Sequence, residues 1–379
     1  MDECGSATSV SAGHGSAAEP ALASQLSLLD RFLPLWIVVA AAVGFGLGQL
    51  SQVHSFIAST TIGSMNALVG AGLLAMMYPP LASVRWELVL NVFKDWRLLL
   101  LTTVQNWIVG PMAMFLLSAA FFHDQPDFMA GFSLVGCSRC IGMVMIWISL
   151  AGGDIEHGAA LIAINSLWTL LFYSLYASLL LQTLPTAMGI AVGDKMHITI
   201  AEIASNVGIY MGIPFALAIA GWFVLVRARG AEWYFETFAP KLDAVAIYAL
   251  LFTIVVLFAS QSERIVSTID SVLFSMIPFL IYFVVIFSGS FLMSRLCGAS
   301  YAQAVTLAFT ATSNNYELSL GVSVATFGLD SDASMMSVVA ALIEIPIMVV
   351  LVRLSHWCRA RFFSPTSPKH LVIETPVAR

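Results

Sequence analysis

The chain has 379 residues, of which 59% are hydrophobic and 10% are charged, and its mean hydropathy is +0.90. Soluble globular domains contain about 45–50% apolar and about 25% charged residues, so this composition indicates an integral membrane protein. Because one crossing takes about 20 apolar residues, the length leaves no room for a large extramembrane domain. A nucleic-acid-binding protein and a secreted disulfide scaffold are also excluded, since the net charge is -6 and there are only five cysteines.

Three regions follow from the hydropathy pattern. Residues 1–29 are rich in Ala, Ser and Gly and lack a signal-peptide pattern, so they are predicted to be a disordered N-terminal tail. Residues 30–358 are predicted to form an all-α domain of ten transmembrane helices, and residues 359–379 a C-terminal tail. The expected spans are 33–50, 57–78, 98–121, 129–150, 159–181, 205–226, 244–260, 272–294, 303–327 and 335–354.

The basic residues predict the orientation of the chain. Ten spans place both termini on one side, and most of the 16 lysines and arginines fall in the tails and loops of that side. Lys195 and Arg264 are the exceptions outside the membrane. The positive-inside rule therefore predicts a multi-pass protein of the cell membrane with cytoplasmic N and C termini.

The two halves of the chain are alike around their fourth spans. An apolar helix that ends near Asp154 is interrupted at residues 137–140, and one that ends near Asp330 is interrupted at residues 312–317. Since each half has five spans, a duplicated second half enters the membrane in the opposite orientation, which is the inverted-repeat plan of secondary transporters. In that plan, discontinuous spans four and nine cross at the midplane and form the site. The alternative is a chance similarity between two apolar helices.

Three charged residues fall inside the predicted spans and away from the span ends, namely Arg139, Glu317 and Glu344. A charge at the centre of a membrane helix costs about 2.5–3.5 kcal/mol on insertion scales, so such residues usually mark an ion or substrate pathway. Glu317 is therefore a candidate proton carrier. The alternative for Arg139 and Glu317 is a structural ion pair at the point where the broken helices cross.

Glu344 precedes Pro346, which frees the carbonyl four positions earlier from its helical hydrogen bond. The counterpart of Glu344 in the first half is expected to be Asn165. We expect both residues to support the exposed backbone of the broken helices, and direct ligation of a solute is the less favoured interpretation.

Cys137 and Cys140 form a Cys-x-x-Cys pattern on one face of a predicted helix. Cysteines at such positions often only pack, and this interpretation has most weight for Cys137. A redox pair needs an exposed, acidified thiol, which a midplane helix does not offer. The third interpretation is that they are soft ligands for a thiophilic metal or metalloid.

Six segments of the chain form an ordered set of motifs. They are GLLAMMYPPL at 72–81, QNWIVGP at 105–111, GIYMGIP at 208–214, EWY at 232–234, FTATSNNYEL at 309–318 and IEIP at 343–346. This set closely resembles the signature segments of the Acr3 arsenite efflux permeases, within the bile acid/sodium symporter superfamily. The resemblance runs in order from about residue 33 to residue 361.

The resemblance implies a ten-helix fold with a panel and a core part and no enzymatic activity or cofactor. It implies export of trivalent arsenite, or antimonite, out of the cytoplasm in exchange for protons. By motif, the functional cysteine of span four falls on Cys140, as a metalloid ligand, and the functional glutamate of span nine falls on Glu317. The partners are then a small inorganic solute, protons and the lipid bilayer, and the sequence does not indicate an oligomeric state.

The chain departs from the family at one place, because Ser138-Arg139-Cys140 stands where the family usually has Ala-Pro-Cys. The proline that breaks the fourth helix is absent and a positive charge lies beside the expected ligand. One hypothesis is that Arg139 holds Glu317 ionised and weakens proton coupling. The other is that Arg139 attracts an anionic substrate, and Ser138 with its neighbouring glycines still permits an irregular backbone.

The expected mechanism is exchange by competition for one site. Arsenite binds among Cys140, Asn314, Asn315 and Cys137 after Glu317 has lost its proton, and reprotonation from outside releases it. The alternative for the two asparagines is that they bond only backbone. The supporting set, which lies around this site, consists of Arg139, Ser138, Glu344, Asn165 and Asn106.

Four other functions fit the sequence less well. A sodium- or proton-coupled transporter of an organic or metalloid anion shares the fold and is favoured by Arg139, but not by the motifs. A membrane thiol oxidoreductase needs a resolving pair near the surface. A passive metalloid channel needs no ionisable residue at the midplane, and the loops are too short for a receptor or scaffold.

Overall fold

The computed structural model describes residues 32–62, 65–86, 95–190, 198–267 and 269–363. The predicted N-terminal tail, residues 1–29, lies outside the described residues. The predicted C-terminal tail lies outside them from residue 364 onward. Its first residues, 359–362, belong instead to the last helix, which continues beyond the expected end of the membrane domain at residue 358.

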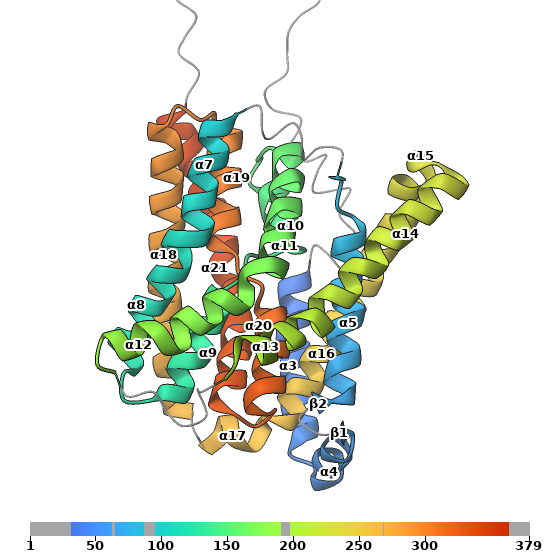
Figure 1. Ribbon diagram of the computed structural model, residues 1–379, viewed down its shortest axis with the longest axis vertical. Coiled ribbons are helices and arrows are strands. Elements are labelled where there is room, and N and C mark those ends of the chain that lie inside the picture. The colour runs from blue at the N-terminus through green and yellow to red at the C-terminus, as the bar shows by residue number, and fades with distance from the viewer. Residues whose placement is uncertain (1–31, 63–64, 87–94, 191–197, 268, 364–379) are drawn as a thin grey trace, which may run out of the picture.

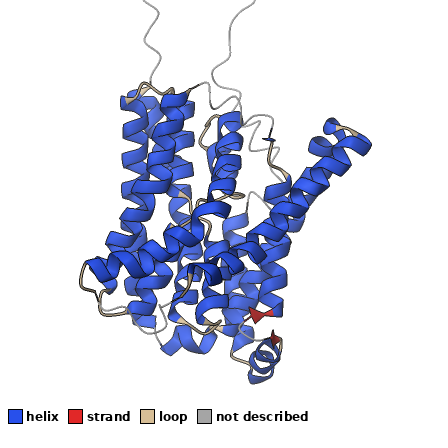
Figure 2. Cartoon of the chain, viewed as in Figure 1, coloured by secondary structure: helices blue, strands red, loops and turns tan. Residues whose placement is uncertain are grey.

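The described chain is almost entirely helical (Figures 1 and 2). Its α-helices are α3 (Leu33–Gly48), α4 (Ser51–Ser59), α5 (Ala67–Ala82), α7 (Trp96–Val104), α8 (Gly110–Phe122), α9 (Pro126–Gly136), α10 (Val144–Leu150), α11 (Ile155–Ser178), α12 (Leu184–Ala187), α13 (Ile200–Val207), α14 (Ile213–Arg229), α15 (Ala231–Trp233), α16 (Ala239–Ser260), α17 (Ser262–Ser267), α18 (Ile269–Leu296), α19 (Tyr301–Thr312), α20 (Tyr316–Phe327) and α21 (Asp332–Phe362). Short π-helical segments are η2 (Gln105–Val109), η3 (Leu179–Thr183), η5 (Gly208–Gly212) and η6 (Tyr234–Phe238), and two strands, β1 (Thr61–Ile62) and β2 (Met65–Asn66), form an antiparallel hairpin.

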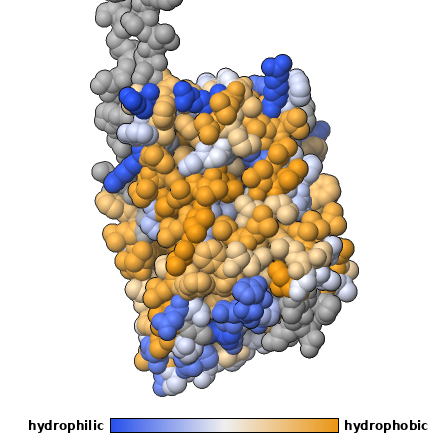
Figure 3. All heavy atoms as spheres, turned by 90° about the vertical axis from the view of Figure 1, so that its left-hand side faces the viewer, coloured by the Kyte–Doolittle hydropathy of each residue, from blue (hydrophilic) through white to orange (hydrophobic). Residues whose placement is uncertain are grey.

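The protein is a multi-pass membrane protein. Within the described residues, 6 helical stretches are long and apolar enough to cross a membrane, or 7 if α3 and α4, bent by 98°, count as one span. Figure 3 shows hydrophobic residues over the middle of one face and hydrophilic residues gathered toward its two ends. The α5 helix and the interrupted pairs α9/α10 and α19/α20 are too short to be counted by length alone, so the total of ten spans stays a prediction.

The predicted second span, 57–78, is wrong in its first part. Instead of one helix, the chain forms the end of α4, the β1–β2 hairpin and then α5. Asn66 explains the change, because its side-chain oxygen accepts hydrogen bonds from the backbone N–H groups of Leu68 and Val69. Its amide nitrogen donates to the carbonyl of Ile57 at 2.7 Å. An asparagine in this capping role starts a new helix rather than continuing the old one.

Proline determines where the helices widen into π-helical turns. Each of the four π segments is followed within two residues by a proline, at Pro111, Pro185, Pro214 and Pro240. A proline has no N–H and its ring collides with the carbonyl four residues earlier, so the preceding turn adopts the wider register. The helices therefore continue past these prolines. Two of the turns lie in the motif segments 105–111 and 208–214, and η6 begins at the last residue of the segment 232–234.

The helices pack in two groups around a shared centre. In one group α16 lies against α3 and α5, and α14 lies against α5; the other contains α8, α9, α18, α19, α20 and α21. Gly44 and Gly48 of α3 let it approach α16 closely, since a Cβ atom on either would lie 2.4 Å or less from atoms of α16 or α17. Small residues four apart are a common means of close helix packing in membranes. The α20 and α21 helices contact the first group through α5 and α3.

Candidate functional site

Two interrupted helices meet near the centre of the protein. The α9 helix ends at Gly136 and the chain resumes as α10 at Val144, while α19 ends at Thr312 and resumes as α20 at Tyr316. Both interruptions lie in the segments where the sequence predicts them. Polar, helix-breaking residue types occupy each gap, and the gap between α9 and α10 is irregular although residues 137–143 contain no proline.

The two gaps are bonded directly to each other through their backbones. Arg139 and Asn314 form an isolated antiparallel bridge. On one side of it the Cys140 N–H donates to the Ser313 carbonyl at 3.1 Å, and on the other the Asn315 N–H donates to the Ser138 carbonyl at 3.3 Å. Unwound backbone inside a membrane is tolerated only where it is buried in protein and hydrogen-bonded, and here each gap supplies the partners of the other.

Arg139 is fully buried at this crossing, with 0% of its surface exposed. Its guanidinium donates to the carbonyls of Gly136 and Ala311, each at 2.7 Å, and to the Tyr282 hydroxyl at 2.8 Å. The alternative in which Arg139 and Glu317 form an ion pair is not supported, because no described carboxylate lies within 4.0 Å of the guanidinium. Two backbone carbonyls and the Tyr282 hydroxyl surround the charge instead.

Glu317 lies in the first turn of α20 and is 8% exposed. It lines a cavity of about 750 Å³ between the two helix groups, together with Met76, Met143 and other residues of α5, α11 and α16. The exposed residues Arg85 and Glu156 line the same cavity. Glu317 is thus a carboxyl group that a small solute or a proton can reach through the cavity, as a proton carrier requires.

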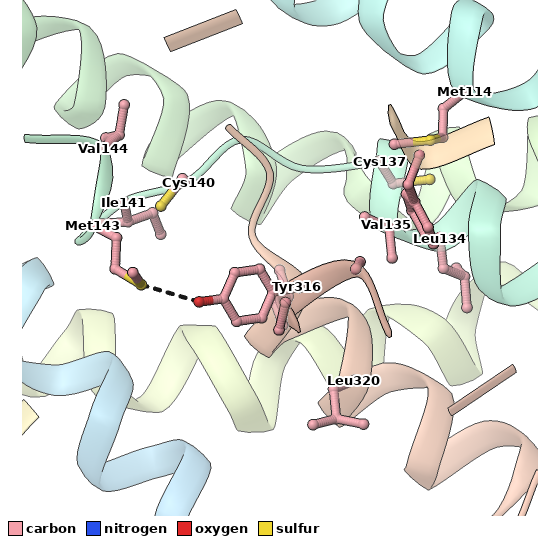
Figure 4. Close-up of a cluster of buried hydrophobic side chains, with 14 of the residues drawn as sticks. Met114, Leu134, Val135, Cys137, Cys140, Ile141, Met143, Val144, Tyr316 and Leu320 are labelled. Carbon is pink, nitrogen blue, oxygen red and sulfur yellow. Dashed lines mark hydrogen bonds between the residues drawn. The ribbon is translucent and has the colours of Figure 1, made fainter. Parts of the chain in front are cut away.

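Cys140 and Cys137 lie apart and have different surroundings (Figure 4). Cys140 immediately precedes the cavity-lining residues 141–143 and lies within electrostatic range of Glu317 and Glu344. Cys137 is on the far side of the gap beside Met114 and Leu134, and its thiol donates to the Ser133 carbonyl at 3.4 Å. The helical register that would have placed both on one face is lost at the break, so Cys137 fills the core, and both thiols are free.

Glu344 is 1% exposed and lies next to the second gap. Its Oε1 atom accepts a hydrogen bond from the Ser313 hydroxyl, while Oε2 is buried with no hydrogen-bond partner. The supporting role predicted for Glu344 matches this position, because Ser313 is the first residue of the unwound segment. Glu317 and Arg139 both lie within electrostatic range of the carboxylate.

The two asparagines of the second gap are tied to the protein. Asn315 caps α20 by accepting from the Leu318 N–H at 2.9 Å, and its Nδ2 atom is buried and unpaired. Asn314 accepts from the Tyr282 hydroxyl at 3.2 Å. Ser138 donates to the Asn315 carbonyl at 3.3 Å. These contacts favour the interpretation in which the asparagines and Ser138 hold the gap in shape.

Asn165 does not support the fourth helix, contrary to the prediction. Its side-chain oxygen accepts from Asn106 at 3.3 Å and from the Trp107 indole at 3.1 Å. Both donors belong to η2, where the π-helical turn before Pro111 turns them toward α11. Asn106 and Asn165 therefore support the widened turn of η2, and Arg139 rather than Asn165 bonds the Gly136 carbonyl at the end of α9.

Sequence reasoning missed two residues of this region. Tyr282 of α18 joins Arg139 to Asn314, and Tyr316 donates its hydroxyl to the Met143 sulfur at 3.0 Å (Figure 4). Tyr316 was part of a motif, but its position in the sequence did not indicate the contact with Met143. Tyr282 lies in an apolar run, and only its polar group in a membrane helix hints at a buried partner.

The described residues contain no group of three or more His, Cys, Asp or Glu side chains that could hold a metal ion. The side chains that could bind a solute here are one nearby thiol, the carboxyl groups of Glu317 and Glu156, and the thioethers of the methionines in the wall. Such a set suits a solute that is bound briefly through one soft contact rather than one held in a cage.

A multi-pass fold in which two interrupted helices cross beside a cavity is typical of secondary transporters. A family model described as the sodium bile acid symporter family matches residues 71–268. The arsenical-resistance protein Acr3 of Corynebacterium glutamicum is 37% identical over 348 residues, covering 91% of this chain and 94% of the relative. Acr3 of Alkaliphilus metalliredigens and an uncharacterized transporter of Synechocystis are each 26% identical, over 88% and 93% of this chain and 94% of each relative.

The chain therefore belongs to the sodium bile acid symporter family, among its Acr3-type permeases. These relatives are transporters and not enzymes, which confirms the expectation that this protein is a transporter of small solutes. The resemblance stated from the six sequence motifs is confirmed as well.

Proposed function

We propose that this protein exports trivalent arsenite, and antimonite by the same chemistry, from the cytoplasm in exchange for protons and so confers arsenical resistance. One observation carries the proposal: two interrupted helices bonded to each other contribute Glu317 and residues 141–143 to the wall of one cavity, and Cys140 directly precedes these residues. The similarity to Acr3 proteins over nearly the whole chain supports the choice of solute. The ten spans and the inverted repeat are part of the same proposal.

The orientation is proposed from the basic residues at one end of the molecule. Arg295 and Arg359 lie over aromatic rings of Phe362 and Tyr301 at that end, where α7, α15 and α19 also gather (Figure 1). The opposite end, with α4 and α17, carries the Arg264–Asp332 pair. The positive-inside rule assigns the first end to the cytoplasm of a cell-membrane protein, with both termini there.

The cavity then opens inward. Arg85, on its rim, lies over the Phe235 ring of η6, at the end of the molecule assigned to the cytoplasm. Cytoplasmic arsenite reaches Glu317 and the 141–143 segment from this side. The orientation and the cavity together describe a state ready to bind solute from inside.

The chemistry of binding needs one labile sulfur. Arsenite near neutral pH is an uncharged hydroxide, so the membrane potential alone does not drive it outward. The Cys140 thiol replaces one hydroxide on arsenic, forming one As–S bond, and the thiol proton leaves with that hydroxide as water. Attack of water reverses the step on the outer side without any change of oxidation state. A single such bond permits turnover, whereas three would retain the metalloid.

Glu317 couples this cycle to protons. Facing inward, it gives up its proton and its carboxylate accepts hydrogen bonds from the remaining As–OH groups. Facing outward, it is reprotonated, those hydrogen bonds are lost and the solute leaves. Because proton and solute compete for one site, each return of the empty carrier moves a proton inward. Asn314, Asn315, Ser138 and Glu344 hold the two gaps in position.

The anionic substrate considered from the sequence is not supported by the contacts of Arg139. Its guanidinium is engaged by three oxygen atoms and is absent from the cavity wall. We therefore keep a neutral metalloid hydroxide as the solute.

Everted membrane vesicles test the proposal. Vesicles containing the protein should accumulate arsenite when their lumen is acidic, and a protonophore should abolish the accumulation. Vesicles from cells without the protein are the control. Accumulation that persists with the protonophore would identify another driving force, and none under any gradient would remove arsenite as the solute.

A further inference from the structure

Arg139 is a buried charge that has no role in the proposed transport cycle. A buried charge without a counter-charge is strongly unfavourable unless other groups solvate it. The guanidinium is 0% exposed, no described carboxylate lies within 4.0 Å of it, and its Nε atom has no partner. Glu344 lies within electrostatic range but not in contact, so the direct compensation comes from the oxygen atoms that surround the other two nitrogens.

Two of these oxygens are free ends of half-helices. Gly136 is the last residue of α9, and Ala311 lies in the last turn of α19. The final carbonyls of a helix have no partner within it, and the helix dipole makes that end negative. Two negative ends therefore converge on the guanidinium, each through a 2.7 Å hydrogen bond.

The third oxygen belongs to Tyr282 and is oriented as an acceptor. Its hydroxyl hydrogen goes to the Asn314 Oδ1 atom at 3.2 Å, so its lone pairs face the Arg139 nitrogen at 2.8 Å. Two helix-end carbonyls and one oriented hydroxyl thus place three oxygen atoms, which are possible ligands for a cation, around one point. In secondary transporters, unwound carbonyls and half-helix C-terminal ends are the groups that coordinate sodium.

We propose that Arg139 is a built-in cation whose guanidinium occupies an oxygen-lined cation position at the crossing of the interrupted helices and thereby makes the transport cycle independent of dissolved sodium. The statement about transport rests on the proposed function. The statement that Arg139 occupies a cation position does not rest on the proposed function, because it concerns only the three oxygen atoms around the guanidinium.

The fit of the guanidinium is close. A Cβ atom on Gly110 would lie 2.9 Å from one terminal nitrogen of Arg139 and 3.0 Å from the other. Gly110 follows η2 directly, so the π-helical turn and the absence of a side chain together leave room for the planar group. Removing the side chain of Arg139 should therefore leave a small polar space that a free guanidinium ion or a sodium ion can enter.

Thermal unfolding of the purified full-length protein in detergent tests the cation position. Arg139→Ala should unfold at lower temperature than the parent in choline chloride. Guanidinium at low millimolar concentration, or sodium, should raise its apparent Tm by about 2–4 °C. The parent should not be stabilised by either ion. An Arg139→Ala protein that responds to neither ion beyond the choline control would overturn the proposal.

Transport in everted vesicles tests the consequence for coupling. The parent should accumulate arsenite at the same rate in sodium and in choline buffers. Arg139→Ala should be slow in choline and recover several-fold with guanidinium or sodium. Sodium dependence of the parent would contradict the proposal. If the parent moves no arsenite at all, the proposed function fails, while the unfolding measurements still decide the cation position.

A second variant covers the case in which Arg139→Ala does not fold. Gly110→Ala adds a methyl group against the guanidinium, and it should lower the Tm and make it sensitive to sodium as the arginine is displaced. Gly46→Ala is the matched control, since a Cβ there meets no atom within 4 Å. Equal behaviour of the two variants would show that the guanidinium is not held in this position.

Discussion

The two interrupted helices meet at one point but are closed in different ways. The gap between α19 and α20 spans only 313–315, and Asn315 caps the following helix within the same segment. The gap between α9 and α10 spans 137–143, and α10 starts without a side-chain cap. Its free carbonyl at Gly136 is satisfied by Arg139, which also reaches α18 and α19. Glu317 is therefore carried by a helix that is capped from its own gap, whereas Cys140 lies in a segment that is followed by an uncapped helix and is closed by Arg139.

The largest expected effect concerns Glu317, in the first turn of α20. Glu317→Gln keeps the size of the side chain but removes the proton carrier, so arsenite accumulation in everted vesicles should fall by about 100-fold or more. Glu156→Gln, in the wall of the same cavity, is the control and should retain most of the activity. Proton-driven accumulation by the Glu317→Gln protein at the parental rate would rule out this carboxyl group as the coupling site.

The next largest effect concerns Cys140, in the gap between α9 and α10. Cys140→Ala removes the sulfur atom that forms the single As–S bond, and if the exchange of that bond for As–OH is favourable by about 1.4 kcal/mol, the concentration for half-maximal transport should rise about tenfold. Cys137→Ala, three residues earlier, should leave that concentration unchanged, because its thiol faces the core beside Met114. Initial rates over a range of arsenite concentrations measure both. Equal shifts in the two variants would mean that the sulfur atoms act through packing.

A smaller effect separates the ways in which the gaps are closed. Asn315→Ala removes the cap of α20 and should destabilise the protein by about 1 kcal/mol, while Asn315→Ser should lose only part of that, since serine also caps helices. Thermal unfolding of the purified variants gives the comparison. If alanine and serine are equally destabilising, the cap is not what closes the second gap.

The smallest effect concerns the contact between the two gaps at the cavity. Tyr316→Phe removes the hydroxyl that donates to the Met143 sulfur but keeps the ring. The expected loss is below about 1 kcal/mol, because sulfur is a weak acceptor, and transport should stay near the parental rate. A large loss of transport would instead make this hydroxyl part of the solute site.

The sequence predicted those parts of the fold that depend on composition and local chemistry. Polar, helix-breaking segments located both interruptions, and Glu317 was recognised because an ionisable side chain in an apolar span requires a reason. The membrane class followed from hydropathy alone. These features need no knowledge of which helices become neighbours.

The errors arose at residues whose roles depend on contacts with other helices. Pairing with a carboxylate was one of the interpretations of Arg139, since charge is visible in a sequence, whereas the carbonyls that a broken helix frees are not. Cys137 was grouped with Cys140 by a helical periodicity that ends between them. Asn165 was assigned by analogy between the halves, but the widened turn before Pro111 brings Asn106 and Trp107 to it. The hairpin before α5 was missed because the predicted span ran through the Ser, Thr and Asn residues of 57–66.

The backbone bridge between Ser138–Cys140 and Ser313–Asn315 has a mechanical consequence. A joint made of main-chain bonds in an apolar interior would expose unpaired amides if it opened, so the two halves of the site must travel together. Alternating access then requires sliding at the boundary with α3, α5 and α16. Crosslinks across that boundary should stop transport, whereas a crosslink between the two gaps should leave transport unchanged.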